Sequence, residues 1–119
     1  MPRKAVAYEQ DYAVGNAQVR LTVLVGDRQY GSSMVFVDDE LIANGDIDEI
    51  PLGSGGDLEG KTAVVYTVVT DIRDRKNEIS VTWILKGGRK ALTVEKTGSA
   101  SKRFGSQMFK ASFHFTDGD

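Results

Sequence analysis

Residues 61–86, with the sequence KTAVVYTVVTDIRDRKNEISVTWILK, decide the fold class of this chain. Residues 63–70 are rich in β-branched and aromatic side chains and are apolar at odd and even positions alike, which is typical of a strand covered on both faces. Residues 78–86 alternate between apolar and polar side chains, with Ile84 as the one exception, and Trp83 lies on the apolar face. The charged segment 73–77 supplies turn-forming residues. We therefore expect a β-hairpin with Trp83 in the core beneath it.

The same two-residue alternation predicts strands on both sides of this stretch. We expect strands over residues 4–14, 17–25, from 34 to 37, over 90–96 and over 109–115, with Gly87-Gly88 as a tight turn. Their inward faces carry Val6, Tyr8, Tyr12 and Val14; Ala17, Val19, Leu21, Val23 and Val25; Leu92 and Val94; and Phe109, Ala111, Phe113 and Phe115. Residues 26–33, 51–60 and 97–106 are expected to be loops because they are polar or rich in glycine.

Two structures remain possible for residues 38–50. Asn44-Gly45 favours a type I′ hairpin, but that register places Glu40 opposite Glu49 and requires a bulge or a bound cation. Alternatively, Asp39 caps a single helical turn that ends at Gly45.

About seven to nine strands without an amphipathic helix indicate an all-β protein. Turn signals recur every 8–12 residues or so, which is typical of an antiparallel two-sheet β-sandwich. The expected architecture is immunoglobulin-like or C2-like in general outline, without the Cys…Trp…Cys spacing of true immunoglobulin domains. We expect one domain over residues 1–119, frayed at 1–3 and 116–119.

Composition narrows the class of protein. The chain has no Cys, which excludes disulfides and thiolate chemistry, and no stretch approaches the ~20 apolar residues of a membrane span. Its beginning lacks the apolar run of a signal peptide, so a cytoplasmic protein is expected. The net charge of −2 combines −7 over residues 1–60 (4 basic, 11 acidic) with +5 over residues 61–119 (11 basic, 6 acidic). Such opposed halves suit self-assembly or a charged partner.

Little in the sequence indicates catalysis. The single histidine, His114, is predicted on the face opposite the apolar residues of its strand, and no nucleophile motif accompanies it. Zinc requires more His or Cys than the chain offers. Nucleic-acid binding is disfavoured because the basic clusters lack interleaved aromatics and the chain is acidic overall. A small hydrolase-like enzyme is therefore the third-ranked function.

A calcium- or small-ligand-binding sandwich is the second-ranked function. Asp46, Asp71 and Asp74 lie in or near turns that would meet at one rim if the strands ran up and down in succession. C2-type modules bind Ca²⁺ with aspartates on loops at one end of a sandwich, and carboxylate oxygens are the ligands that Ca²⁺ prefers.

The first-ranked function is a non-enzymatic binding or assembly module that associates with itself or another protein and needs no cofactor. The first and last strands are the expected sheet edges, where unpaired backbone groups invite a partner. The aromatic residues expected at such an interface are Tyr8, Tyr12, Tyr30 and Phe104.

Overall fold

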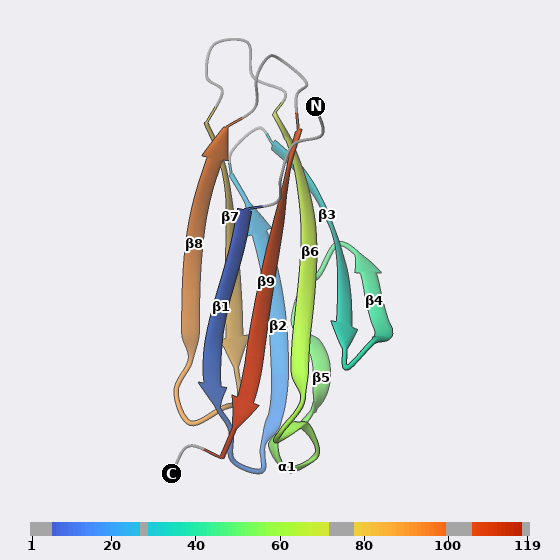
Figure 1. Cartoon of the computed structure of the whole chain (residues 1–119), viewed down its shortest axis with the longest axis vertical. Coiled ribbons are helices and arrows are strands. Elements are labelled where there is room, and N and C mark those ends of the chain that lie inside the picture. The colour runs from blue at the N-terminus through green and yellow to red at the C-terminus, as the bar shows by residue number, and fades with distance from the viewer. Residues whose placement is uncertain (1–5, 27–28, 72–77, 100–105, 118–119) are drawn as a thin grey trace.

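The computed structural model describes residues 6–26, 29–71, 78–99 and 106–117. Two β-sheets pack face to face and form an elongated sandwich (Figure 1). The five-stranded sheet has the order β1 (Val6–Ala13), β9 (Ser106–Thr116), β6 (Thr62–Asp71), β3 (Gln29–Val37) and β4 (Glu40–Gly45). The four-stranded sheet has the order β5 (Ile50–Ser54), β2 (Gln18–Val25), β7 (Glu78–Lys86) and β8 (Leu92–Ser99). The pairing is antiparallel except between β1 and β9, which run parallel. The predicted β-sandwich is confirmed.

The core lies between the two sheets and is built by the predicted alternation. The inward side chains of β7 and β9 are almost completely buried: Ile79, Val81, Trp83, Leu85, Phe109, Ala111, Phe113 and Phe115. The Trp83 ring stacks on Tyr8 with 6.3 Å between centroids and meets Phe109 edge-on at 6.4 Å. The prediction that Trp83 anchors the core is therefore correct.

The predicted hairpin over residues 61–86 is wrong. The two strands form as expected, but β6 pairs with β3 and β9 in one sheet, whereas β7 pairs with β2 and β8 in the other. Alternation in the sequence shows which side chains face the core, but it does not show which strand is the hydrogen-bonded neighbour. A segment that connects two strands of different sheets therefore has the same sequence pattern as a hairpin turn. The expectation that β6 is covered on both faces is also wrong, because Val68 is exposed and Val64 and Tyr66 are only half-buried.

Residues 38–50 adopt neither of the two expected structures. The tight turn lies at Asp38-Asp39, whose φ values of 48° and 73° are the left-handed values that a type I′ turn requires. Asp38 fits this position because its Oδ1 accepts a hydrogen bond from the Thr62 amide and its own amide donates to the Thr62 carbonyl, both at 3.0 Å. Residues 40–45 then form β4 against β3, so Glu40 lies opposite Val37 instead of Glu49.

Several segments that the sequence predicted to be loops or frayed ends belong to strands or to a helical turn. Residues 50–54 form β5, and a single turn of helix, α1 (Gly55–Leu58), follows it; Leu58 is buried and the Ser54 hydroxyl accepts a hydrogen bond from the Asp57 amide. Strand β3 begins at Gln29 instead of residue 34, and Thr116 pairs with Ala13 and is not frayed. Strand β1 is an edge as predicted, but β9 lies inside its sheet. The helix in the described part of the chain is far too short to cross a membrane.

Candidate functional site

The four aromatic residues expected at an interface differ in exposure. Tyr12 is a core residue with 4 % of its surface exposed, so its assignment to an interface is wrong; its position follows from the inward parity of β1. Tyr8 has the same parity, packs on Trp83 and carries the Lys96 ammonium 4.6 Å above its ring. Tyr30 is 69 % exposed, and Phe104 lies outside the described residues.

Exposed apolar side chains gather on one surface, the outward face of the five-stranded sheet. Six large apolar side chains are strongly exposed among the described residues, and five of them lie on β3, β4, β6 and β9. Together with three half-buried neighbours they form a patch that we call the outer apolar face: Tyr30, Met34, Phe36, Leu41, Val64, Tyr66, Val68 and Met108. The sixth, Leu24, lies on the four-stranded sheet.

The strand register makes this face continuous. Met34 lies opposite Tyr66, Phe36 lies between Val64 and Leu41, and Val68 lies opposite Met108. Residues directly opposite on neighbouring strands share a face and have touching side chains. The Phe36 and Tyr66 rings meet edge-on with 6.0 Å between centroids, and a hollow of about 200 Å³ separates them from Asp39.

Charge is sparse within the outer apolar face. Lys110 is the one charged residue in the described rows that cross its centre, and its ammonium lies 5.8 Å from the centroid of the Tyr66 ring. The surface therefore has aromatic and methionine side chains at its centre and charged residues at its margins. This is the composition that protein interfaces have.

His114 lies at one margin of the same sheet and links three strands. As its parity predicted, it points outward; Nδ1 is 2.9 Å from the Thr62 hydroxyl of β6, and Nε2 is 2.5 Å from Oε1 of Glu9 on β1. A hydroxyl, an imidazole and a carboxylate in this order form the constellation of many nucleophilic enzymes. Here, however, the Glu9 side chain is 70 % exposed and the three groups lie on an open sheet face, without the enclosed site that such chemistry uses. The geometry favours a polar link between strands.

The aspartates of the predicted calcium site lie in different places. Asp46 is exposed beyond the end of β4, next to Gly45, which pairs with Ser33. Asp71 is the last residue of β6 and lies opposite Gln29. Gln29 and Ser33 are four residues apart along β3, so the positions of Asp71 and Asp46 are separated by about 13 Å along the strand direction. Asp74 lies outside the described residues, among which no three acidic or histidine side chains are grouped to hold a metal. The calcium site stays a prediction.

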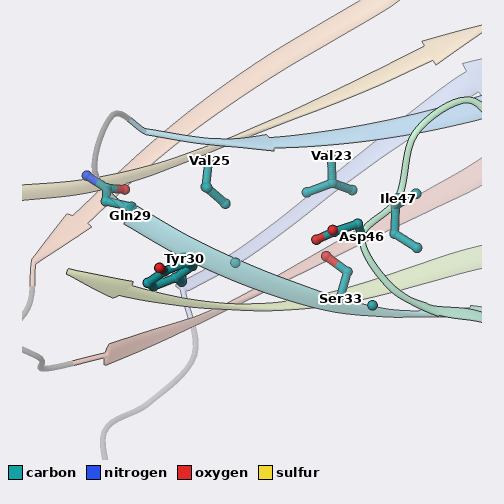
Figure 2. Close-up of a pocket in the computed structure, with 9 residues that line it drawn as sticks. Val23, Val25, Gln29, Tyr30, Ser33, Asp46 and Ile47 are labelled. Atoms are coloured by element: carbon teal, nitrogen blue, oxygen red, sulfur yellow. The ribbon is translucent and has the colours of Figure 1, made fainter. Parts of the chain in front are cut away.

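Two further concave sites lie between neighbouring chain segments. One opens between β2 and β3, has a volume of about 170 Å³, and holds Asp46 and Ser33 at one end and Gln29 and Tyr30 at the other (Figure 2). That volume is below the ~300–1,000 Å³ of typical ligand pockets. The other, about 420 Å³, lies between residues 11–13 and 89–92. Two of its polar groups are already engaged, because the Tyr12 hydroxyl accepts a hydrogen bond from the Gly88 amide and Nε of Arg89 donates to the Asp117 carbonyl.

Comparison of the chain with family models, with curated proteins and with solved structures found no match. The functional argument therefore depends on the geometry of the molecule. Of the residues on the outer apolar face, the sequence singled out only Tyr30. For Val64, Tyr66 and Val68 the signal was the apolar character of residues 63–70 at odd and even positions alike. That pattern also fits a strand with one face in the core and an apolar outer face.

Proposed function

We propose that this protein is an assembly module that forms a dimer with a second copy of itself through the outer apolar face. One observation carries the proposal: five of the six strongly exposed large apolar side chains within the described ranges lie on that single face. Scattered exposed apolar residues are ordinary on protein surfaces, whereas a contiguous patch marks an interaction site.

The area of the face supports a second copy as the occupant. Four neighbouring strands, spaced about 4.8 Å apart and about nine residues long at about 3.3 Å a residue, present roughly 570 Å² of sheet surface. Interfaces of standard size bury about 600–1,000 Å² on each partner, so the face together with its margins reaches the lower end of that range. Two such faces can pack about 10 Å apart as a second sandwich interface, related by a two-fold axis in the plane between them.

The experiment places a charge at the centre of the face. Val68→Glu puts a carboxylate between Ser32 and Met108, where dimerisation would remove it from water among apolar side chains. We expect the unmodified protein to sediment as a dimer in about 1 M NaCl, where screening removes weak charge-driven contacts. The variant should weaken the dimer at least 100-fold.

Leu24→Glu is the control, because Leu24 is also strongly exposed (51 % against 37 % for Val68) but lies on the other sheet. It should leave the dimer intact. At protein concentrations low enough for every protein to be monomeric, both variants should keep the free energy of unfolding within about 0.5 kcal/mol of the unmodified protein. A monomeric unmodified protein at high concentration, or a Val68→Glu variant that dimerises normally, would refute the proposed function.

A further inference from the structure

Charge is segregated between the two narrow sides of the sandwich. Residues 29–60 contain no Lys or Arg and form β3, β4, β5 and α1. Their eight carboxylates are all exposed: Asp38, Asp39, Glu40, Asp46, Asp48, Glu49, Asp57 and Glu59. We call the side formed by β4, β5 and α1 the acidic side.

The opposite narrow side has a basic cluster at one end. Strand β8 is the far edge of the four-stranded sheet, and the turn from β7 to β8 carries Lys86, Arg89 and Lys90, all exposed. We call this turn the basic side. The rest of this flank has charges of both signs, on β8 and on the neighbouring β1: Glu95, Lys96, Glu9 and Asp11. Figure 1 shows β8 at the left margin and β4 at the right, with the β7–β8 turn, the β3–β4 turn and α1 all in the lower part of the view.

We propose that copies of this chain also join head to tail, with the acidic side of one copy against the basic side of the next. The two sides lie on opposite flanks and toward the same end of the long axis, so copies that stand side by side and parallel bring opposite charges together. Such a contact uses two different surfaces, so it generates a ring or a filament and not a closed pair. This contact does not involve the outer apolar face.

The charges on the acidic side have no basic partner within the described part of the molecule. None of its eight carboxylates forms an ion pair with a described Lys or Arg. Repulsion between these carboxylates opposes contact between two acidic sides. A basic side from another copy brings positive charges next to them and lowers that repulsion. Each exposed pair contributes only about 0.2–1 kcal/mol, so several must act together, and salt should weaken the contact.

The strands at these flanks have room for a neighbour. Both β4 and β8 end their sheets, so each has one row of backbone groups without a strand partner in the described sheets. Exposed edges template pairing with other chains, and like charges on an edge prevent pairing with an identical one. Strand β4 itself carries one carboxylate, Glu40, and β8 carries Glu95 and Lys96, so the preference for unlike sides comes from the carboxylates around β4 and the cations of the β7–β8 turn.

The experiment uses two reversal variants in the Val68→Glu background, which removes the apolar contact. Asp39→Lys/Asp48→Lys disables the acidic side, and Lys86→Glu/Lys90→Glu disables the basic side. In about 10 mM salt, where the screening length is about 30 Å, we expect the background protein to sediment as oligomers. Each reversal variant alone should be monomeric.

Mixing the two variants is the decisive measurement. Each retains one intact side, so an equimolar mixture should form one-to-one dimers or larger assemblies in which the two variants alternate, and about 1 M NaCl should dissociate them. Lys110→Glu in the same background is the control for a charge reversal elsewhere on the surface, because Lys110 lies on neither side; it should assemble like the background.

Three results would overturn the head-to-tail contact: a monomeric background protein in low salt, a mixture that stays monomeric, or a reversal variant that assembles alone. None of them would affect the proposed dimer, which is measured in high salt with an unmodified outer apolar face.

Discussion

At the residue scale, Trp83 is the side chain on which the two sheets depend most. Its ring is completely buried between Tyr8 and Phe109. Its Nε1 has no hydrogen-bond partner among the described residues, so its contribution comes from apolar packing. Trp83→Ala should lower the free energy of unfolding by ~3–5 kcal/mol in a urea titration. Leu24→Ala, on an exposed face, should change it by less than about 0.5 kcal/mol. A loss below about 1 kcal/mol at Trp83 would contradict the assignment of faces in β7.

Tyr12 links the end of β1 to the β7–β8 turn and should make stability depend on pH. Burial raises the pKa of its hydroxyl above the ordinary value of 10.0, and the hydrogen bond from the Gly88 amide acts in the opposite direction. A raised folded-state pKa means that the fold favours the protonated hydroxyl. The stabilisation is therefore complete below about pH 10 and is lost as the pH rises through the folded-state value.

The variant Tyr12→Phe isolates this effect. At pH 7 it should lower the free energy of unfolding by about 1 kcal/mol, because the Gly88 amide loses its acceptor. Above pH 10 the unmodified protein loses stability through this hydroxyl and the variant does not, so the difference should shrink in urea titrations from pH 8 to 11. Tyr30→Phe, at an exposed position, should show neither effect. A difference that stays constant or grows with pH would contradict the burial of the Tyr12 hydroxyl.

At the scale of elements, the turn between β7 and β8 depends on its glycines, and Gly87 is the more constrained of the two. Gly87 has a φ of +95°, and a Cβ there would lie 1.9 Å from the Gln18 carbonyl oxygen. Gly87→Ala should therefore destabilise the fold by about 2–3 kcal/mol, measured by thermal or urea unfolding. Gly15→Ala is the control: nothing lies within 4 Å of its Cβ position, and we expect a change of at most about 1 kcal/mol, toward higher stability. Equal effects of the two substitutions would show that the turn is built differently.

The elements also show what sequence reasoning can and cannot reach. Alternation identified the buried faces of β2, β7 and β9 because burial of one face requires a period of two. It could not identify neighbours, since β6 and β7 satisfy the same pattern whether they pair or lie in different sheets. The turn at Asp38-Asp39 was missed because Asn44-Gly45 is the stronger type I′ signal, and Asp enters left-handed backbone less readily than Gly. The hydrogen bonds of Asp38 with Thr62, 24 residues away, determine the outcome.

At the scale of the whole molecule, the candidate surfaces depend on how the strands are assembled. The outer apolar face arises from residues on four strands that only the sheet order brings together, so of its members only Tyr30 could be named from the sequence. The opposed charges of the two halves of the chain were visible in the sequence. The gathering of carboxylates on one flank follows from residues 29–60, which contain no Lys or Arg and form β4 and β5 at the ends of both sheets on that side. The molecule thus presents one broad apolar face and two narrow charged sides.

These surfaces should respond to salt in opposite ways, which gives a prediction for the unmodified protein. Association of apolar faces is not weakened by NaCl, whereas contacts between exposed charges fade as the screening length falls from about 30 Å at 0.01 M to about 3 Å at 1 M. Sedimentation velocity across this range should show large assemblies in low salt that decrease to a dimer and then stop decreasing. In Val68→Glu the same series should end at the monomer. An unmodified protein that reaches the monomer in high salt would mean that charge alone holds the assembly together. A size independent of salt would mean that the charged sides make no contact.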